Sequence, residues 1–63
     1  MTEAEISMWK LNIENNATTV CDLYGQAVVS SIFRRYDAHN IDDLSPAYYS
    51  EVFGYSEQIA NDD

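Results

Sequence analysis

The chain has 63 residues, with eleven Asp and Glu against three Lys and Arg, which gives a formal net charge of −8. This length holds one domain at most, residues 1–63, and so small a domain buries only about 60% of the surface that its unfolded chain exposes. The negative charge would repel phosphates, which excludes direct nucleic-acid binding and makes a basic protein surface the expected partner. The composition is not that of a disordered chain, because 46% of the residues are hydrophobic and 13% are aromatic.

Cellular location is predicted from the cysteine count and the start of the chain. Cys21 is the only cysteine, so no internal disulfide can form, which fits a reducing compartment. The chain begins with an acidic stretch, Met1–Glu5, with no apolar segment of the kind found in signal peptides behind it. No apolar run approaches the length of a membrane span. We therefore expect a cytoplasmic protein that makes no contact with membranes.

A first helix is predicted to begin after Thr2, whose side chain can cap it while Glu5 reaches back to form a capping box. Apolar residues then recur at helical spacing: Ile6, Trp9 and Ile13. The pair Asn15-Asn16 is predicted to end the helix, because Asn competes for backbone hydrogen bonds and tolerates the left-handed conformation. The alternation in residues 11–13 leaves a short N-terminal strand open as an alternative.

A second helix is predicted over residues 20–36, with Thr19 as its N-cap and Asp22 near the positive end of its dipole. One apolar row contains Val20, Leu23, Tyr24, Ala27, Val28, Ile32 and Tyr36. Val29 and Phe33 form a second row beside it, so the helix is predicted to be central or to pack on another chain. Gly25 lies inside this pattern, and a close crossing with another helix would explain it.

A turn is predicted over residues 37–44, followed by a third helix with Ser45 as its N-cap and Pro46 at its first position. Leu44 and Tyr49 have the spacing of a hydrophobic staple. The inward stripe is predicted to contain Tyr49, Val52, Phe53, Ser56, Ile59 and Ala60, and residues 61–63 are predicted to form a frayed acidic end. The predicted fold class is all-α. The second and third helices are predicted to form a small helical hairpin, and the domain has three helices if the first segment is helical and packs across that hairpin.

Catalysis and metal binding are poorly supported by the sequence. His39 is the only imidazole and Cys21 the only thiol, so no catalytic set can be assembled, and we expect neither enzyme activity nor a cofactor. The predicted turn does gather possible metal ligands: Asp37, His39, Asp42 and Asp43. Counted from Asp37, however, the sixth and twelfth positions of a calcium loop hold Asp42 and Tyr48 rather than Gly and Glu. No metal site is therefore expected.

The function predicted from these features is non-catalytic protein binding through an acidic surface that carries tyrosines. Tyrosine rings anchor such interfaces, while carboxylates supply steering and specificity. In its sharpest form, the acidic surface imitates DNA and blocks the nucleic-acid site of another protein, as phage anti-restriction and anti-CRISPR inhibitors do. The alternative is a homodimer or larger homo-oligomer in which Val29 and Phe33 form the interface. The predicted partner-binding residues are Asp42, Asp43, Tyr48, Glu51, Tyr55 and Glu57.

Several segments in the second and third predicted helices and in the turn between them also match a recurring pattern. They are Leu23-Tyr24-Gly25, Val28-Val29, Arg35-Tyr36-Asp37-Ala38, residues 41–46 and residues 49–53. This pattern resembles short uncharacterised proteins of Gram-positive phages and mobile elements, in which a helical hairpin of the form YG…V…RYGA…L…Y…F recurs. Asp37 stands where that pattern has a helix-ending Gly. The resemblance implies an origin in a phage or mobile element and an accessory or inhibitory role, and it implies no activity.

Overall fold

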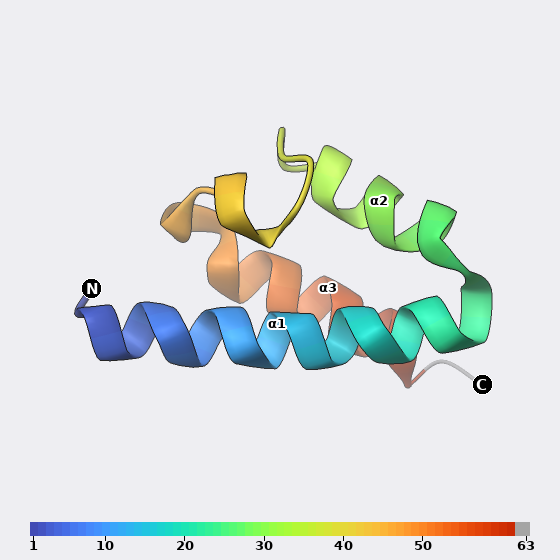
Figure 1. The fold of residues 1–63 in the computed structure, drawn as a ribbon, viewed down its shortest axis with the longest axis horizontal. Coiled ribbons are helices and arrows are strands. Elements are labelled where there is room, and N and C mark those ends of the chain that lie inside the picture. The colour runs from blue at the N-terminus through green and yellow to red at the C-terminus, as the bar shows by residue number, and fades with distance from the viewer. Residues whose placement is uncertain (62–63) are drawn as a thin grey trace.

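A computed structural model of the chain describes residues 1–61, and within this range the regular structure is helical throughout. The described residues contain three α-helices, α1 (Glu3–Tyr24), α2 (Gln26–Arg34) and α3 (Tyr49–Ala60). Gly25 alone separates α1 from α2, and two short 3-10 helices, η1 (Ile41–Asp43) and η2 (Pro46–Tyr48), lie between α2 and α3. In Figure 1, α2 folds back from the end of α1, and α3 runs in the same direction as α1. The predicted all-α, three-helix domain is confirmed. Asp62 and Asp63 of the predicted frayed end lie outside the described residues.

The start of α1 follows the sequence prediction. Thr2 Oγ1 accepts a hydrogen bond from the Glu5 backbone N–H at 3.2 Å, and Glu5 Oε1 accepts one from the Thr2 backbone N–H at 3.1 Å. This reciprocal capping box satisfies two backbone donors that the first helical turn leaves without partners. Residues 3–14 are therefore helical, and the alternative of a short N-terminal strand is wrong.

The predicted end of the first helix at Asn15-Asn16 is also wrong, because α1 continues to Tyr24. Its buried face keeps helical spacing through the two asparagines, with Ile13 and Val20 fully buried and Ala17 half-buried between them. Packing of this continuous face outweighs the weak helix propensity of Asn. Thr19 is accordingly not an N-cap: it lies inside α1, where its hydroxyl donates to the Asn15 carbonyl at 3.2 Å.

Gly25 separates α1 from α2, and the backbone rather than a close crossing explains why glycine is there. Its φ of 95° lies in a region that L side chains rarely adopt, and nothing lies within 4 Å of the position that a Cβ would occupy. The Gly25 N–H donates to the Cys21 carbonyl at 2.8 Å, which closes the last turn of α1. The chain then reverses direction, so the single predicted helix over residues 20–36 is in fact the end of one helix and the whole of another.

The reversal at Gly25 changes which apolar row is buried. Val29, Ile32 and Phe33 form the buried face of α2, whereas Leu23 and Tyr24 at the end of α1 are 57% and 49% exposed. The prediction treated residues 20–36 as one helix with a single apolar face. Because the chain changes direction at residue 25, the residues before and after it belong to two helices with different axes and do not share a face. The row predicted as secondary therefore belongs to the core.

Alanine substitutions at the two glycines are expected to have opposite effects. Gly25→Ala should lower the free energy of unfolding by about 1 kcal/mol, because the left-handed φ strains any residue with a Cβ. Gly54→Ala should raise it by about 0.5–1 kcal/mol, because Gly54 lies inside α3 with open space around the Cβ position. Urea unfolding followed by Trp9 fluorescence measures both changes. Stabilisation by Gly25→Ala would show that the chain does not turn at this residue.

The predicted turn over residues 37–44 is confirmed, and its geometry begins at Asp37. This residue has a φ of 61°, the left-handed conformation that usually ends a helix at glycine or asparagine. The Ala38 N–H then donates to the Phe33 carbonyl at 3.1 Å. Asp37 thus follows α2 in a left-handed backbone conformation that glycine adopts without steric cost.

The approach to α3 differs in detail from the prediction. Pro46 does lie at a first helical position, but it opens the 3-10 turn η2, and α3 itself begins at Tyr49. Ser45 makes no side-chain capping bond. Leu44 and Tyr49, the predicted hydrophobic staple, are both buried in the core.

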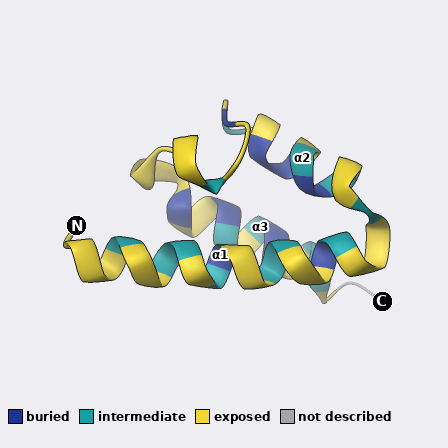
Figure 2. Cartoon of the chain, in the orientation of Figure 1, coloured by how far each residue is buried: buried dark blue, intermediate teal, exposed yellow. Residues whose placement is uncertain are grey.

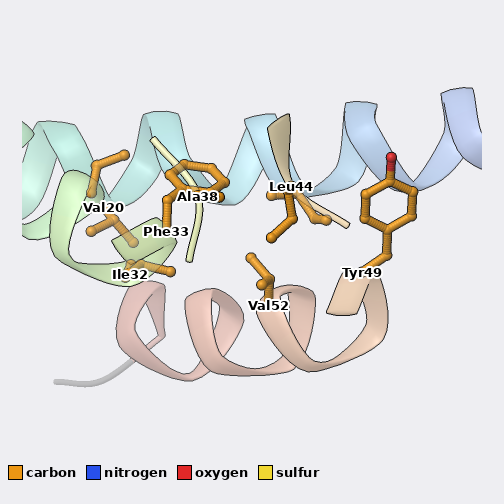
Figure 3. Packing of buried hydrophobic residues seen from close by; sticks show 9 residues of the cluster. Val20, Ile32, Phe33, Ala38, Leu44, Tyr49 and Val52 are labelled. Atoms are coloured by element: carbon orange, nitrogen blue, oxygen red, sulfur yellow. The ribbon is translucent and has the colours of Figure 1, made fainter. Parts of the chain in front are cut away.

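The core lies where α1, α2, α3 and the turn segment meet. Figure 2 shows buried positions recurring at intervals along each helix, and Figure 3 shows side chains from all three helices projecting into one interior. The predicted stripe of α3 is confirmed, with Tyr49, Val52 and Ser56 buried and the remaining members half-buried. The most extensive helix contact is between α1 and α3 rather than within the predicted hairpin of α2 and α3. The core residues are Ile13, Val20, Val29, Ile32, Phe33, Ala38, Leu44, Tyr49 and Val52.

Candidate partner-binding site

Unpaired negative charge is the main chemical property of the surface. Nine of the eleven carboxylates belong to residues 1–61, and all nine side chains are exposed. Within that range, no carboxylate lies within 4 Å of a Lys or Arg nitrogen, and the Asp43 carboxylate lies 2.9 Å from the His39 imidazole. The carboxylates are therefore fully available to solvent or to a cationic partner, apart from those that cap backbone groups.

Asp43 is one of the capping carboxylates. Its Oδ1 accepts hydrogen bonds from the backbone N–H groups of His39 at 2.9 Å and Asn40 at 3.1 Å, and its Oδ2 lies 2.9 Å from His39 Nδ1. The Asn40 side chain in turn accepts from the backbone N–H of Asp42 at 2.8 Å and that of Asp43 at 3.3 Å. Asp43 was predicted to contact a partner, and in the structure it also holds the turn together.

These bonds make Asp43 unusually acidic. The hydrogen bond from the Asn40 backbone, followed by that from the His39 side chain, lowers the pKa of the Asp43 carboxyl from 3.8 to about 2. Both contacts favour the ionised form of the carboxyl group. Because the pKa is lower in the folded state than in the unfolded state, this carboxylate stabilises the fold above pH 4, and its contribution is lost as the pH falls towards 2.

Acid titration of an Asp43 variant is expected to show this contribution. Between about pH 4 and pH 2, the urea midpoint of Asp43→Asn should fall less than that of the unsubstituted chain, because an amide does not titrate there. Asp42→Asn is the matched control, since the neighbouring Asp42 carboxylate makes no hydrogen bond within residues 1–61. Its midpoint should fall as steeply as that of the unsubstituted chain. An equal fall in all three proteins would contradict the assignment.

The two predicted tyrosine anchors both contact residues that directly follow α2. The Tyr48 and Tyr36 rings have centroids 5.5 Å apart, and Tyr48 remains 40% exposed. The Arg35 guanidinium lies 4.9 Å from the centroid of the Tyr55 ring, and its Nη1 donates to Tyr55 Oη at 3.4 Å. The consecutive residues Arg35 and Tyr36 therefore hold the Tyr48 ring of η2 and the Tyr55 ring of α3. A partner would meet rings whose orientation is already set, which lowers the entropy cost of binding.

The predicted site residues only partly come together. Tyr48, Glu51 and Tyr55 follow one another at steps of three and four, so they share one face of η2 and α3. Glu57 is six residues beyond Glu51, which places it about 120° around the helix from that carboxylate. Asp42 and Asp43 lie in η1, before the helix begins. Only Tyr48, Glu51 and Tyr55 therefore form a small face of tyrosines and one carboxylate, and α3 carries no dense carboxylate stripe within the described residues.

A second feature was not predicted from the sequence. A hollow of about 380 Å³ lies between the C-terminal half of α1, α2 and η1. The hollow could not be predicted from a first helix that ends at Asn15-Asn16, because the part of α1 that lines it extends from Glu14 to Asp22. The helical spacing of Glu14, Thr18 and Cys21 was the available signal. The hollow is lined by Glu14, Ala17, Thr18, Cys21, Asp22, Gln26, Val29, Phe33, Asn40 and Ile41.

The described residues offer little for cofactor or metal chemistry. Within residues 1–61, no three His, Cys, Asp or Glu side chains converge in a way that could hold a metal ion. Cys21 is half-buried, and its Sγ donates to Gln26 Oε1 at 3.6 Å across the bend at Gly25. In the same part of the chain, no helix combines the length and the apolar character needed to cross a bilayer.

The interface predicted for self-association is wrong. Val29 and Phe33 are each only 6% exposed, because they pack into the core of their own chain. Other apolar side chains are exposed instead, among them Met8 at 53% and Leu11 at 59% on α1. Any contact between two copies would therefore have to use residues other than the predicted ones.

Comparison with known proteins adds no relative to this description. No protein-family model, no curated protein and no solved structure matches the chain at a significant level.

Proposed function

We propose that this protein is a non-catalytic binding module whose acidic surface associates with a basic surface on another protein. The observation that carries the proposal is the exposure of all nine carboxylates in residues 1–61, with no Lys or Arg nitrogen of that range within 4 Å of any of them. Unpaired exposed charges attract a partner of opposite sign and speed its approach. The same charges repel nucleic acids and anionic membranes.

The face formed by Tyr48, Glu51 and Tyr55 is the proposed centre of contact. Tyrosine rings combine a large apolar area with a hydroxyl group, which suits partly hydrated interfaces. Glu51 lies exposed between the two rings and offers its carboxylate to a cationic side chain. Asp42, Asp43 and Glu57 lie outside this face, where they add to the attractive field at longer range.

The sharpest form of this function is inhibition. A small acidic protein that occupies the basic cleft of a nucleic-acid-binding protein would keep DNA or RNA out of it, and this would take place in the cytoplasm. The resemblance to short proteins of phages and mobile elements favours this form. Such elements benefit when they block host restriction or CRISPR proteins, which are the targets of anti-restriction and anti-CRISPR inhibitors.

Affinity capture followed by competition tests this proposal. The purified chain is immobilised, proteins from its native host are captured at low and at high salt, and each captured protein is then challenged with duplex DNA. The proposal predicts a basic nucleic-acid-binding protein that is released by salt and displaced by DNA. Capture only of proteins that resist both treatments, or tight binding of the chain itself to duplex DNA, would reject it.

The alternative proposal is a homo-oligomer, and the exposure of Met8 and Leu11 on one face of α1 is the observation that favours it. Mutual repulsion between two chains that each carry a net charge of −8 opposes this association. Sedimentation at physiological salt separates the two proposals. A monomer agrees with the binding module, whereas a dimer that dissociates on Leu11→Glu substitution would establish the alternative.

A further inference from the structure

The hollow between α1, α2 and η1 has an apolar interior and acidic edges. Ala17, Val29, Phe33 and Ile41 contribute apolar walls, and Val29 and Phe33 are almost wholly buried beneath it. Its volume of about 380 Å³ falls in the range of pockets that bind ligands. The hollow contains no residue of α3, so it is separate from the face of Tyr48, Glu51 and Tyr55.

The charges around the hollow specify the sign of its occupant. Glu14 and Asp22 line it from α1, both side chains are exposed, and no Lys or Arg is among the lining residues. The two carboxylates are eight residues apart on one helix, which separates them by about 12 Å along its axis. An occupant that matches this pattern carries two positive charges at that separation with an apolar group between them.

We infer that the hollow binds an extended basic peptide segment of the partner, with an apolar side chain inside and a lysine or arginine on either side. In an extended chain, residues i, i+2 and i+4 point to the same side, and the first and last are about 13 Å apart. The central side chain would rest against Val29, Phe33 and Ile41, while the flanking cations meet Glu14 and Asp22. This inference rests on the proposed function, because it assumes a basic partner, but it names a different contact surface.

Nuclear magnetic resonance with a defined probe tests the inference. The probe is a blocked pentapeptide with lysine at its ends, leucine at its centre and serine between them. It is titrated into the 15N-labelled full chain, and the shifted amides are mapped onto the structure. The inference predicts shifts concentrated at Ala17, Val29 and Ile41, and much smaller shifts when glutamate replaces both lysines of the probe or serine replaces its leucine.

Two double variants with the same change in charge provide the control. Glu14→Gln with Asp22→Asn should weaken binding of the lysine peptide about tenfold, whereas Glu3→Gln with Asp37→Asn, two exposed carboxylates that do not line the hollow, should leave it nearly unchanged. Far-ultraviolet circular dichroism verifies that both variants are folded. Equal weakening by the two variants, shifts that map to α3, or the absence of any binding would overturn the inference.

The outcomes separate this inference from the proposed function. Peptide binding at the hollow, without displacement of any captured partner by DNA, would support the inference and reject the proposed inhibition. Displacement of a captured partner by DNA, without peptide binding at the hollow, would support the proposed inhibition and reject the inference.

Discussion

Replacing Ile13 with alanine is expected to lower the free energy of unfolding by about 2–5 kcal/mol, the largest effect of any substitution considered for this chain. Ile13 is fully buried at the middle of α1 and belongs to the core that joins α1 to α3. Truncation removes apolar contacts and leaves a cavity that the surrounding helices fill only in part. A domain of this size has little stability in reserve, so a large fraction of the molecules should be unfolded without denaturant.

Leu11→Ala provides the matched control for this prediction. Leu11 lies two residues away on the same helix but is 59% exposed, so its truncation should change the free energy of unfolding by less than about 0.5 kcal/mol. Urea unfolding followed by Trp9 fluorescence and by circular dichroism measures both variants. Trp9 is the only tryptophan, and the centroid of its ring lies 5.8 Å from that of the Phe53 ring on α3, so its fluorescence reports on the contact between α1 and α3. Similar losses in the two variants would mean that α1 does not bury the face described here.

Asn16→Ala is expected to cost about 2 kcal/mol, which is the second-largest effect. The Asn16 side-chain Nδ2 donates to the Phe53 carbonyl and to Ser56 Oγ, each at 3.3 Å, and these bonds join α1 to α3. Ser56 is almost fully buried, so the loss of Asn16 removes two hydrogen bonds from a region that water cannot readily enter. The higher helix propensity of alanine offsets a few tenths of this loss.

Asn15→Ala tests the same residue type one position earlier. Its side chain is exposed and makes no hydrogen bond within residues 1–61, so the gain in helix propensity should leave the protein equally stable or slightly more stable. The two asparagines should thus differ in unfolding midpoint, with the Asn16 variant clearly lower. Equal midpoints would show that Asn16 does not hold α1 against α3.

The sequence predicted the fold class but not the helix boundaries, and Asn15-Asn16 and Gly25 show why. Asparagine pairs often end helices, yet here the apolar spacing from Ile13 to Val20 continues across them and one asparagine bonds to another helix. Such a bond joins residues 37 positions apart, so no local rule can foresee it. Gly25 was read as a helix-crossing position, because a sequence does not display the positive φ that ends α1 there.

The candidate site was predicted less completely than the fold. Tyr48, Glu51 and Tyr55 share a face because their spacing within a helix is a local property, which the sequence does reveal. The contacts of Arg35 and Tyr36 with the two tyrosine rings depend on how α2 meets α3, which the sequence does not show. The hollow likewise depends on the angle at Gly25. In the candidate site, the face shared by residues of one segment was therefore predictable, whereas the contacts and the hollow formed between elements were not.

The account depends on the attraction of exposed, unpaired carboxylates to a basic protein. Its most direct test is the dissociation constant for the captured partner, measured by calorimetry at low and at physiological salt. The unsubstituted chain is compared with a variant that carries Asp42→Asn, Glu51→Gln and Glu57→Gln. We expect binding to weaken at least about tenfold with added salt, and about tenfold in the variant at low salt. A dissociation constant unaffected by both salt and the three substitutions would contradict the account.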